Sequence, residues 1–272
     1  MFLFMEKTFL HGLMLTEQLI DDIVFMCKSR MKSTYFTRAA NCKMDFRNLI
    51  MFGLNFVKKS LQIELDSFFT IIKGAENGIT KQGYSEARQK ISPAAFIKMA
   101  DNITAWYYGD DDFKTFNGYR ISAIDGSILE INNSERLRNA FGYAEGKTVQ
   151  LARAKASCIY DLENDMIITS KITKYTTGER EIAVELIEKL KSMGLKNDLI
   201  LFDRGYPSRN FIAYLEDSGV KYLMRVKNCS MKEFNEAIES DQIVNFKADG
   251  KLVRVRVLRF MLDSDVEEVL VR

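Results

Sequence analysis

The sequence predicts an α/β protein whose helical N-terminal half precedes a domain built on a mixed β-sheet. Apolar residues recur at helical spacing from about residue 13 to residue 102. From residue 119 the pattern alternates as in strands. Three such segments are followed by a long amphipathic helix and a short apolar strand, in the order β-β-β-α-β. The composition, 47% hydrophobic and 28% charged in 272 residues, is typical of a globular chain.

The N-terminal half, predicted as a helical domain over residues 1 to 115, contains one polar helix among apolar ones. GAENGIT (74 to 80) predicts a turn, and TKQGYSEARQKI (80 to 91) predicts a short helix after it. Its side chains are of the types that contact phosphates and base edges, namely Lys81, Gln82, Tyr84, Ser85, Arg88 and Lys90. This helix is either the second limb of a DNA-binding helix-turn-helix or an ordinary surface helix, and the pattern alone does not separate the two.

Positive charge is concentrated in this half, although the net charge of the chain is only +2. Residues 30 to 100 contain 12 Lys or Arg and 5 Asp or Glu. Such an excess favours a polyanionic partner such as DNA, whose binding would weaken with salt. A solvated helical surface without a partner has the same composition. The acidic run DDDF (110 to 113) predicts a solvated linker, because it lacks the ligand spacing of a calcium loop.

The second half contains the elements of a β-sheet domain, predicted over residues 116 to 230, and of a partial β-rich insertion over residues 231 to 272. The predicted elements are strands over 119 to 131, 149 to 161 and 166 to 175, a helix over 179 to 196, a strand over 198 to 203, a helix over 208 to 220, a strand over 221 to 227 and a hairpin over 242 to 262. The turn at 162 to 165 joins the second of these strands to the third, and the three strands together predict an antiparallel meander.

Cysteine and histidine usage excludes several classes of site. The 4 cysteines form no CxxC pair, so neither a zinc knuckle nor a disulfide framework is indicated. His11 is the single histidine, which excludes His-based zinc proteases and argues against a Ser-His-Asp triad. No signal peptide, membrane span or phosphate-binding glycine loop is recognised. We therefore expect a cytoplasmic protein with no membrane partner and no nucleotide cofactor.

Two aspartates end apolar strand segments. Asp125 follows the apolar part of the first strand, and Asp203 follows the run LILF in the fourth. After a meander and a crossover helix, the fourth strand commonly returns parallel to the first, which places both carboxylates at one sheet edge. There they repel each other and lose hydration, and a bound Mg²⁺ or Mn²⁺ removes both costs. Each aspartate alone would also suit a turn or a helix cap, but the pair favours a metal site.

Several segments resemble a bacterial insertion-sequence transposase of the DDE type, of the fourth insertion-sequence family. The most specific are AIDGS (123 to 127) and DRGYPS (203 to 208), the latter in a strand-to-helix setting. The other similar segments lie within residues 36 to 69, 83 to 96, 141 to 168, 178 to 183 and 199 to 227. The likeness covers roughly residues 36 to 230.

The resemblance implies a ribonuclease-H-like catalytic core, preceded by an all-α domain that binds the terminal inverted repeats of double-stranded DNA. It implies metal-dependent cleavage and strand transfer into target DNA, with Mg²⁺ or Mn²⁺ as cofactor. By matching position, Asp125 and Asp203 become the first two metal-binding members of a catalytic carboxylate triad. Arg225 matches a basic residue that is either a DNA contact or a solvated strand arginine. A homodimer assembled on DNA is expected by resemblance only.

The sequence departs from the family pattern at the third carboxylate. Family members carry it in a Tyr-x2-Arg-x3-Glu motif, and no tyrosine of this sequence begins that motif. Glutamates that are weaker candidates for the role are Glu233, Glu236, Glu239, Glu267 and Glu268. The final residues VEEVLVR lie in an apolar run without a cap or polar tail. We therefore expect a C-terminally truncated transposase that is a poor or inactive catalyst.

Two other functions remain open. A shortened chain that only occupies inverted repeats, or joins full-length partners, would be a non-catalytic DNA-binding fragment or an inhibitor. A glutamate helix encoded downstream would favour the transposase, and its absence would favour the binding function. A metal-dependent nuclease or phosphatase unrelated to transposition is the weakest alternative, because Asp125-Gly126-Ser127 lacks the second acid of an aspartate phosphatase motif.

Overall fold

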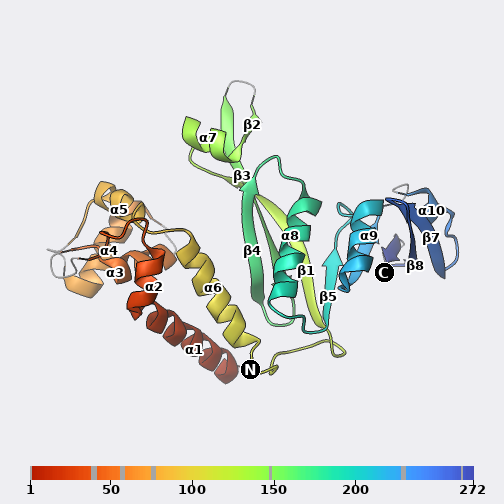
Figure 1. Cartoon of the computed structure of the whole chain (residues 1–272), viewed down its shortest axis with the longest axis horizontal. Helices are drawn as coiled ribbons and strands as arrows, with labels where there is room; N and C mark the ends of the chain where they lie inside the picture. The colour runs from red at the N-terminus through yellow and green to blue at the C-terminus, as the bar shows by residue number, and fades with distance from the viewer. Residues whose placement is uncertain are drawn as a thin grey trace. The chain divides into compact units, whose positions relative to one another are not determined.

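The computed structural model contains two compact units, Met1–Tyr107 and Tyr108–Arg272, which we call the helical unit and the sheet unit (Figure 1). The described residues are 2–37, 42–55, 59–74, 78–146, 149–227, 231–264 and 266–272. The middle of the turn predicted at 74 to 80 therefore lies outside the described residues. The division falls at Tyr107, before the linker predicted at 110 to 113.

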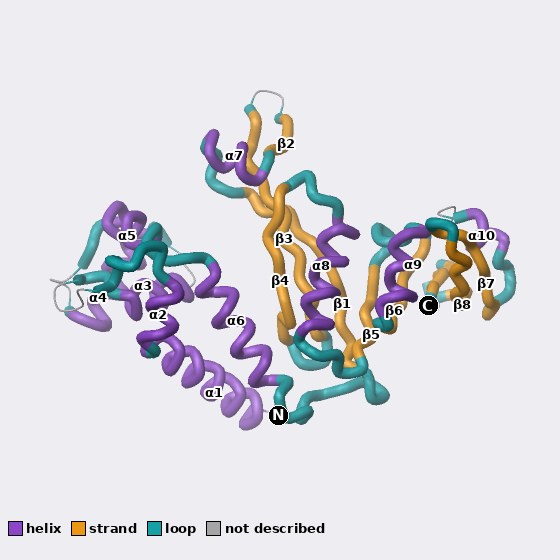
Figure 2. Tube along the Cα trace, in the orientation of Figure 1, coloured by secondary structure: helices purple, strands orange, loops and turns teal. Residues whose placement is uncertain are grey.

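The helical unit consists of helices, drawn in purple in Figure 2, that are joined by loops, drawn in teal. Its helices are α1 (Phe2–Asp21), α2 (Ile23–Ser29), α3 (Phe46–Leu54), α4 (Leu61–Lys73), α5 (Lys81–Arg88) and α6 (Ala94–Tyr107). Aspartate and threonine side chains cap several of them. Asp45 Oδ1 accepts a hydrogen bond from the Asn48 amide at 2.8 Å, and Thr80 Oγ1 accepts one from the Gly83 amide at 3.2 Å. These caps satisfy amides that have no partner within the first helical turn.

Aromatic side chains form the centre of the helical unit. Phe52 is 1% exposed and lies edge-on to both Phe68 and Tyr84, with ring centroids 5.3 and 4.8 Å apart. Leu65 and Phe69 are fully buried in the same cluster. The sequence indicated helical spacing here, and the structure shows which face of α3 is buried: it carries Phe46, Leu49, Ile50 and Phe52, whereas Leu54 of the same helix is 48% exposed.

The sheet unit is built on a mixed sheet with helices, as the sequence predicts. Its elements are β1 (Arg120–Glu130), α7 (Glu135–Phe141), β2 (Tyr143–Glu145), β3 (Gln150–Asp161), β4 (Met166–Lys174), α8 (Glu179–Ser192), β5 (Asp198–Phe202), α9 (Arg209–Ser218), β6 (Lys221–Val226), α10 (Lys232–Glu236), β7 (Asp241–Ala248), β8 (Lys251–Met261) and β9 (Glu267–Val271). The strand order is β2-β3-β1-β5-β6-β9-β8-β7, and β4 pairs with the free side of β3.

The directions of the central strands follow from their connections. β3 runs antiparallel to β1, and β4 runs antiparallel to β3. The turn between β3 and β4 is short, whereas the connection from β1 to β3 contains α7 and β2. The helix α8 then carries the chain back, so that β5 lies parallel to β1, and α9 does the same for β6 beside β5. Helix α8 lies along the sheet in Figure 1 and buries its apolar side, including Ile182, Leu186 and Leu190.

A buried ion pair joins the first residues of the two parallel central strands. Arg120 and Asp198 are register partners, and Arg120 Nε donates to Asp198 Oδ1 at 2.7 Å. Their side chains are 2% and 1% exposed. The Arg120 guanidinium also lies over the Tyr108 ring, 4.4 Å from its centroid, and the Tyr108 hydroxyl donates to Asp161 at 2.7 Å. The starts of β1, β5 and the end of β3 are thus tied together by charge-assisted hydrogen bonds.

The last 42 residues continue the sheet, although the sequence assigns them to a separate partial insertion. The hairpin of β7 and β8 turns at Asp249 and Gly250, close to the predicted turn. Strand β9, which the sequence does not predict, pairs with both β6 and β8. Helix α7 and strand β2 were also not predicted. Helix α10 ends at Glu236, so Glu239 lies outside the helix on which the sequence placed it.

No described helix is both long and apolar enough to cross a membrane. Cys27, Cys42 and Cys158 are free thiols.

Candidate active site

The two predicted aspartates lie at the same level on adjacent parallel strands. The register of β1 and β5 pairs Ala123 with Leu201, and Asp125 and Asp203 each come two residues later. Because side chains alternate along a strand, the Asp125 carboxylate belongs to the side of the sheet on which Ala123 lies, and Asp203 begins the loop that directly follows β5. The structure therefore brings together two residues that are far apart in the sequence.

Both aspartates are exposed, which corrects the expectation that each would lose much of its hydration. They lie past the paired part of β1 and β5, where solvent reaches them. Asp203 Oδ1 accepts a hydrogen bond from the Gly205 amide at 2.9 Å, and Asp125 Oδ1 accepts one from the Gly126 amide at 2.8 Å. The Ser157 hydroxyl donates to the Asp125 carbonyl at 2.8 Å. Each carboxylate keeps oxygen lone pairs free for another ligand.

Three more side chains surround this pair. Tyr206 is buried, and this burial raises the pKa of its hydroxyl. The negative charges of Glu179, Asp125 and Asp203 raise that pKa further. Cys158 is the register partner of Asp125, and burial, followed by the Asp125 charge, raises the pKa of its thiol. The protein therefore presents a negatively charged surface patch, here called the acidic site, formed by Asp125, Asp203 and Glu179.

Glu179 was not identified from the sequence. It is the first residue of α8, and its Oε1 lies 3.9 Å from Lys155 Nζ. A carboxylate in the first turn of a helix has an ordinary explanation, because it stabilises the helix dipole. Only the packing of α8 beside the Asp203 loop indicates that Glu179 belongs to the acidic site.

The donor set of the acidic site fits Mg²⁺ or Mn²⁺. Mg²⁺ is usually bound by one or two carboxylates and keeps several waters, which an exposed carboxylate within β1 and another just after β5 permit. The absence of a side chain at Gly205 leaves this side of Asp203 open, because a Cβ there would lie 3.1 Å from Asp203 Oδ1 and 3.7 Å from Glu179 Oε2. Among the described residues, no three His, Cys, Asp or Glu side chains are arranged as a ready metal cage.

Four of the five glutamates that were candidates for the third carboxylate are engaged in ion pairs. Glu233 receives both of its bonds from Arg209, at 2.7 Å each. Glu236 Oε1 lies 3.6 Å from Lys232 Nζ, and Glu267 Oε2 lies 2.9 Å from Arg259 Nη1. Glu268 pairs with Arg204 and Arg225. The Glu239 amide donates to Gln242, and no cation is recorded beside its carboxylate among the described residues.

Glu268 is a buried carboxylate held between two arginines. Its side chain is 5% exposed, and it accepts hydrogen bonds from Arg225, at 2.5 and 3.1 Å, and from Arg204. These bonds hold the pKa of the Glu268 carboxyl below its ordinary value, and the hydrogen bond from Arg225 is the largest cause. Arg204 directly follows Asp203, so Glu268 joins strand β9 to the loop of the acidic site. A carboxylate neutralised in this way is unsuited to serve as a metal ligand.

The pH dependence of stability tests this assignment of Glu268. A carboxyl whose folded pKa is depressed stabilises the fold above its unfolded pKa, and this stabilisation is lost as the pH falls through the folded pKa. We expect Glu268→Gln to be less stable than the wild type near neutral pH. Between about pH 5 and pH 3 the urea midpoint of Glu268→Gln should fall less steeply than that of the wild type. Glu236→Gln, which removes an exposed pair, is the control, and equal slopes for wild type and Glu268→Gln would contradict the assignment.

Arg225 is thus paired with Glu268, although its side chain remains 51% exposed. The hydrogen bond to Glu268, the largest cause, raises the pKa of Arg225. Of the two interpretations that the sequence left open, a solvated arginine or a DNA contact, neither includes this carboxylate partner.

The residues of the polar helix α5 divide into two groups. Lys81, Gln82 and Arg88 are exposed, and Lys90 just beyond the helix is half-buried. Tyr84 is 7% exposed and packs on Phe52, so it belongs to the core and is not available on the surface. Burial raises the pKa of the Tyr84 hydroxyl. The exposed polar surface of α5 therefore comes from its lysine, glutamine and arginine side chains.

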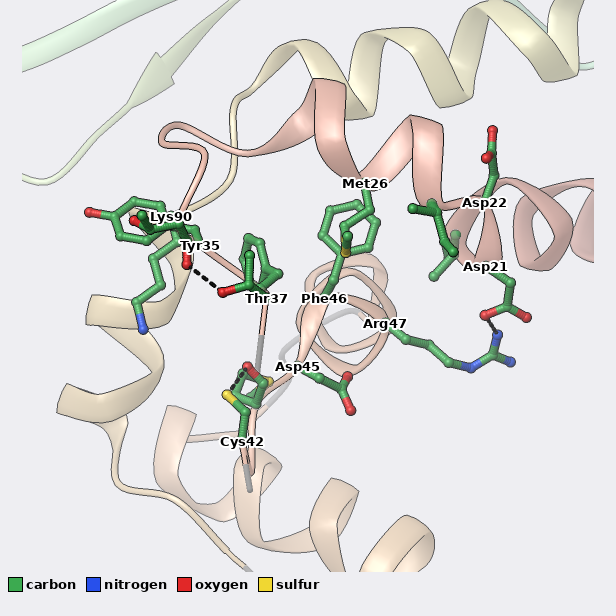
Figure 3. Close-up of a pocket in the computed structure, with 15 residues that line it drawn as sticks. Asp21, Asp22, Met26, Tyr35, Thr37, Cys42, Asp45, Phe46, Arg47 and Lys90 are labelled. Atoms are coloured by element: carbon green, nitrogen blue, oxygen red, sulfur yellow. Dashed lines mark hydrogen bonds and ion pairs between the residues drawn. The ribbon is translucent and has the colours of Figure 1, made fainter. Parts of the chain in front are cut away.

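A cavity of about 830 Å³ in the helical unit is lined by α2, α3 and residues 34 to 37 (Figure 3). Four of its five charged residues already have structural partners. Arg47 binds Asp21 at 2.5 Å, and Asp22 and Asp45 cap α2 and α3. We assign no function to this cavity.

Comparison with known proteins identifies the sheet unit. Residues 116–257, just over half of the 272, match the family model described as Transposase DDE domain, which confirms the resemblance to a DDE transposase. No curated protein matches the sequence. Several solved structures are similar to it, among them two transposase complexes. One is a piggyBac transposase synaptic complex with hairpin DNA, with a TM-score of 0.47 and 12% identity, over 96% of this chain and 60% of that chain.

The other is a Drosophila P element transposase strand transfer complex, with a TM-score of 0.28 and 9% identity, over 75% of this chain and 50% of that chain. The chain thus spans 60% and 50% of the lengths of these two structures.

Proposed function

Because the chain belongs to the transposase DDE domain family, we propose that it is a DNA transposase that cleaves DNA and transfers strands at insertion-sequence ends. The observation that carries this proposal is the pair of exposed carboxylates, Asp125 and Asp203, at one level on parallel strands β1 and β5. The order β4-β3-β1-β5-β6, with β5 and β6 parallel to β1, supports a ribonuclease-H-like core.

In this proposal Asp125 and Asp203 hold Mg²⁺ or Mn²⁺. The metal would supply Lewis-acid stabilisation of charge on the phosphodiester oxygens. The protein's own part is to hold one carboxylate on strand β1 and the other at the start of the loop after β5, so that little reorganisation is needed when metal and DNA bind. Exposure of both carboxylates suits a large polyanionic substrate, since a DNA backbone cannot enter a closed pocket.

The helical unit would bind the DNA ends. Exposed Lys81, Gln82 and Arg88 on α5 are suited to contact phosphates and base edges, and they lie in the part of the chain with the strongest excess of positive charge. Binding of this kind weakens steeply with salt. The remaining parts of the proposal, a bacterial cytoplasmic setting and a homodimer assembled on DNA, rest on the resemblance to insertion-sequence transposases.

A second function is favoured because no residue of the given sequence is identified as the third carboxylate. The sequence contains no Tyr-x2-Arg-x3-Glu motif, and Glu268 is held by two arginines. With two of three carboxylates, the chain would bind DNA without efficient cleavage and act as a DNA-binding fragment or inhibitor of a complete transposase.

Substitution of the aspartates tests the proposal. We expect Asp125→Asn and Asp203→Asn to lose bound Mn²⁺, measured by electron paramagnetic resonance, because a neutral amide is a weaker ligand for a hard cation. We expect Mn²⁺-dependent nicking of supercoiled plasmid to fall about a hundredfold or more. Asp249→Asn is the matched control, because it removes an aspartate at a hairpin turn where the backbone φ of 47° also suits asparagine.

The outcomes separate the two functions. Loss of metal binding and nicking in both variants, with an unchanged control, supports a metal-dependent transposase. Salt-sensitive DNA binding by a wild type that binds Mn²⁺ but does not nick supports the DNA-binding alternative. Nicking that survives both substitutions would contradict the assignment of the acidic site.

A further inference from the structure

Arg180 makes an unusual set of contacts with the loop that follows Asp203. Its Nε donates to the Tyr206 carbonyl at 2.8 Å, and its Nη2 donates to the carbonyls of Gly205 at 2.9 Å and Pro207 at 3.1 Å. One side chain from the first turn of α8 thus binds three consecutive carbonyls. These carbonyls lie between β5 and α9, where neither a strand ladder nor a helix supplies donors.

The guanidinium suits this task better than an ammonium would. Its donors are fixed in one plane, so that a single group can hold several acceptors in a defined arrangement. Hydrogen bonds from a charged donor are also stronger than those between neutral groups. Arg180 therefore restricts the path of the loop in a way that a flexible lysine cannot reproduce.

The same loop sets the position of the Asp203 carboxylate. Asp203 Oδ1 accepts from the Gly205 amide at 2.9 Å, and the Tyr206 amide donates to the Asp203 carbonyl at 3.3 Å. The Tyr206 ring is 2% exposed and packs between the Phe202 and Phe211 rings, with centroids 5.3 and 6.0 Å away. The ring anchors the loop to the core, and Arg180 holds its backbone from the side of α8.

We propose that Arg180 is a positioning residue for Asp203, acting through the backbone of residues 205 to 207. The proposal rests on the proposed function, because it concerns metal held by Asp203. Loss of Arg180 would free the peptide group between Gly205 and Tyr206, which directly follows the Gly205 amide that orients the Asp203 carboxylate. Loss of outer contacts that orient a metal ligand typically weakens metal affinity or activity by about 10- to 100-fold.

The experiment measures Mn²⁺ affinity of the full chain without DNA, in wild type, Arg180→Met and Arg180→Lys. We expect a roughly 10- to 100-fold weaker affinity for Arg180→Met and a smaller or equal loss for Arg180→Lys. We also expect high Mn²⁺ concentration to restore nicking by Arg180→Met but not by Asp203→Asn, because the former keeps its carboxylate. Hydrogen exchange of the amides of residues 203 to 207 should rise in Arg180→Met.

Lys191→Met is the matched control, since it removes one positive charge from the last turn of the same helix, where Lys191 pairs only with Glu188 among the described contacts. Its Mn²⁺ affinity should equal that of the wild type. The urea midpoint and the exchange of β1 amides, followed in parallel, identify any variant that has lost its fold. In that case Arg180→Lys, which keeps the charge and most of the side-chain volume, decides the comparison.

Each further outcome has a defined meaning. Unchanged Mn²⁺ affinity with weaker DNA binding in Arg180→Met would overturn the positioning role and indicate a direct phosphate contact. If wild type binds Mn²⁺ and Asp203→Asn does not, while Arg180→Met binds as the wild type does, the positioning role fails and the proposed function stands. If the wild type binds no Mn²⁺, both fail together.

Discussion

Asp198→Ala is expected to destabilise the sheet unit by about 3 to 5 kcal/mol, because it leaves the buried Arg120 guanidinium without its carboxylate. The two side chains are 2% and 1% exposed, so water cannot replace the lost partner without opening the sheet. Asp198 Oδ2 also accepts from the Lys196 amide at 2.9 Å, and that bond would be lost as well. The measurement is hydrogen exchange of the β1 and β5 amides in the full chain, which reports the local free energy of opening.

Two control variants define what the Asp198 result means. Asp217→Ala removes the partner of Lys251 in a pair that is 68% and 61% exposed, and it should leave the exchange of β1 unchanged. The double variant Arg120→Met with Asp198→Leu removes both charges and should recover much of the stability, since apolar replacement of a buried pair is often neutral or stabilising. A small effect of Asp198→Ala would show that water reaches Arg120 in solution.

Phe52→Ala is expected to destabilise the helical unit by about 3 to 5 kcal/mol, the usual cost of removing a buried aromatic ring. Phe52 is 1% exposed and lies between the rings of Phe68 and Tyr84, so its removal leaves a cavity between α3, α4 and α5. Trp106, the single tryptophan, lies in α6 of the same unit, and its fluorescence during urea unfolding reports the change.

Ile71→Ala is the matched control for the helical unit, because Ile71 is 84% exposed and its removal leaves no cavity. We expect the exchange of β1 amides to be the same in Phe52→Ala and the wild type, since the two units have separate cores. Because Tyr84 packs on Phe52, the substitution should also weaken DNA binding through α5. A stable Phe52→Ala variant would contradict the placement of this ring in the core.

The acidic site was predictable from the sequence to a limited extent. Asp125 and Asp203 were identified because each ends an apolar strand segment, a local pattern that a sequence displays directly. Glu179 and Arg180 were not, because a helix that begins Glu-Arg-Glu has an ordinary explanation in its own dipole and solvated surface. What distinguishes them is the loop of residues 205 to 207, which only the packing of α8 brings beside them.

Tyr84 and Glu268 show the same limit. The sequence places Tyr84 among polar side chains on a short helix, and nothing local shows that its ring turns toward Phe52. Glu268 was one of several acidic residues near the end of the sequence, and its two arginines lie 64 and 43 positions away. Strand β9 was missed for a related reason, since the hydrogen bonds that make it a strand come from β6 and β8.

By itself, then, the sequence determined the helical first half, the strands and helix that order the sheet, the two aspartates at strand ends and the resemblance to DDE transposases. These properties depend on periodicity and on short motifs, which residues close in the chain establish among themselves. The tertiary structure decided which polar residues are buried, which carboxylates are already neutralised, and which arginine holds the loop after Asp203. Those properties depend on contacts between distant residues, and such contacts exist only once the chain has folded.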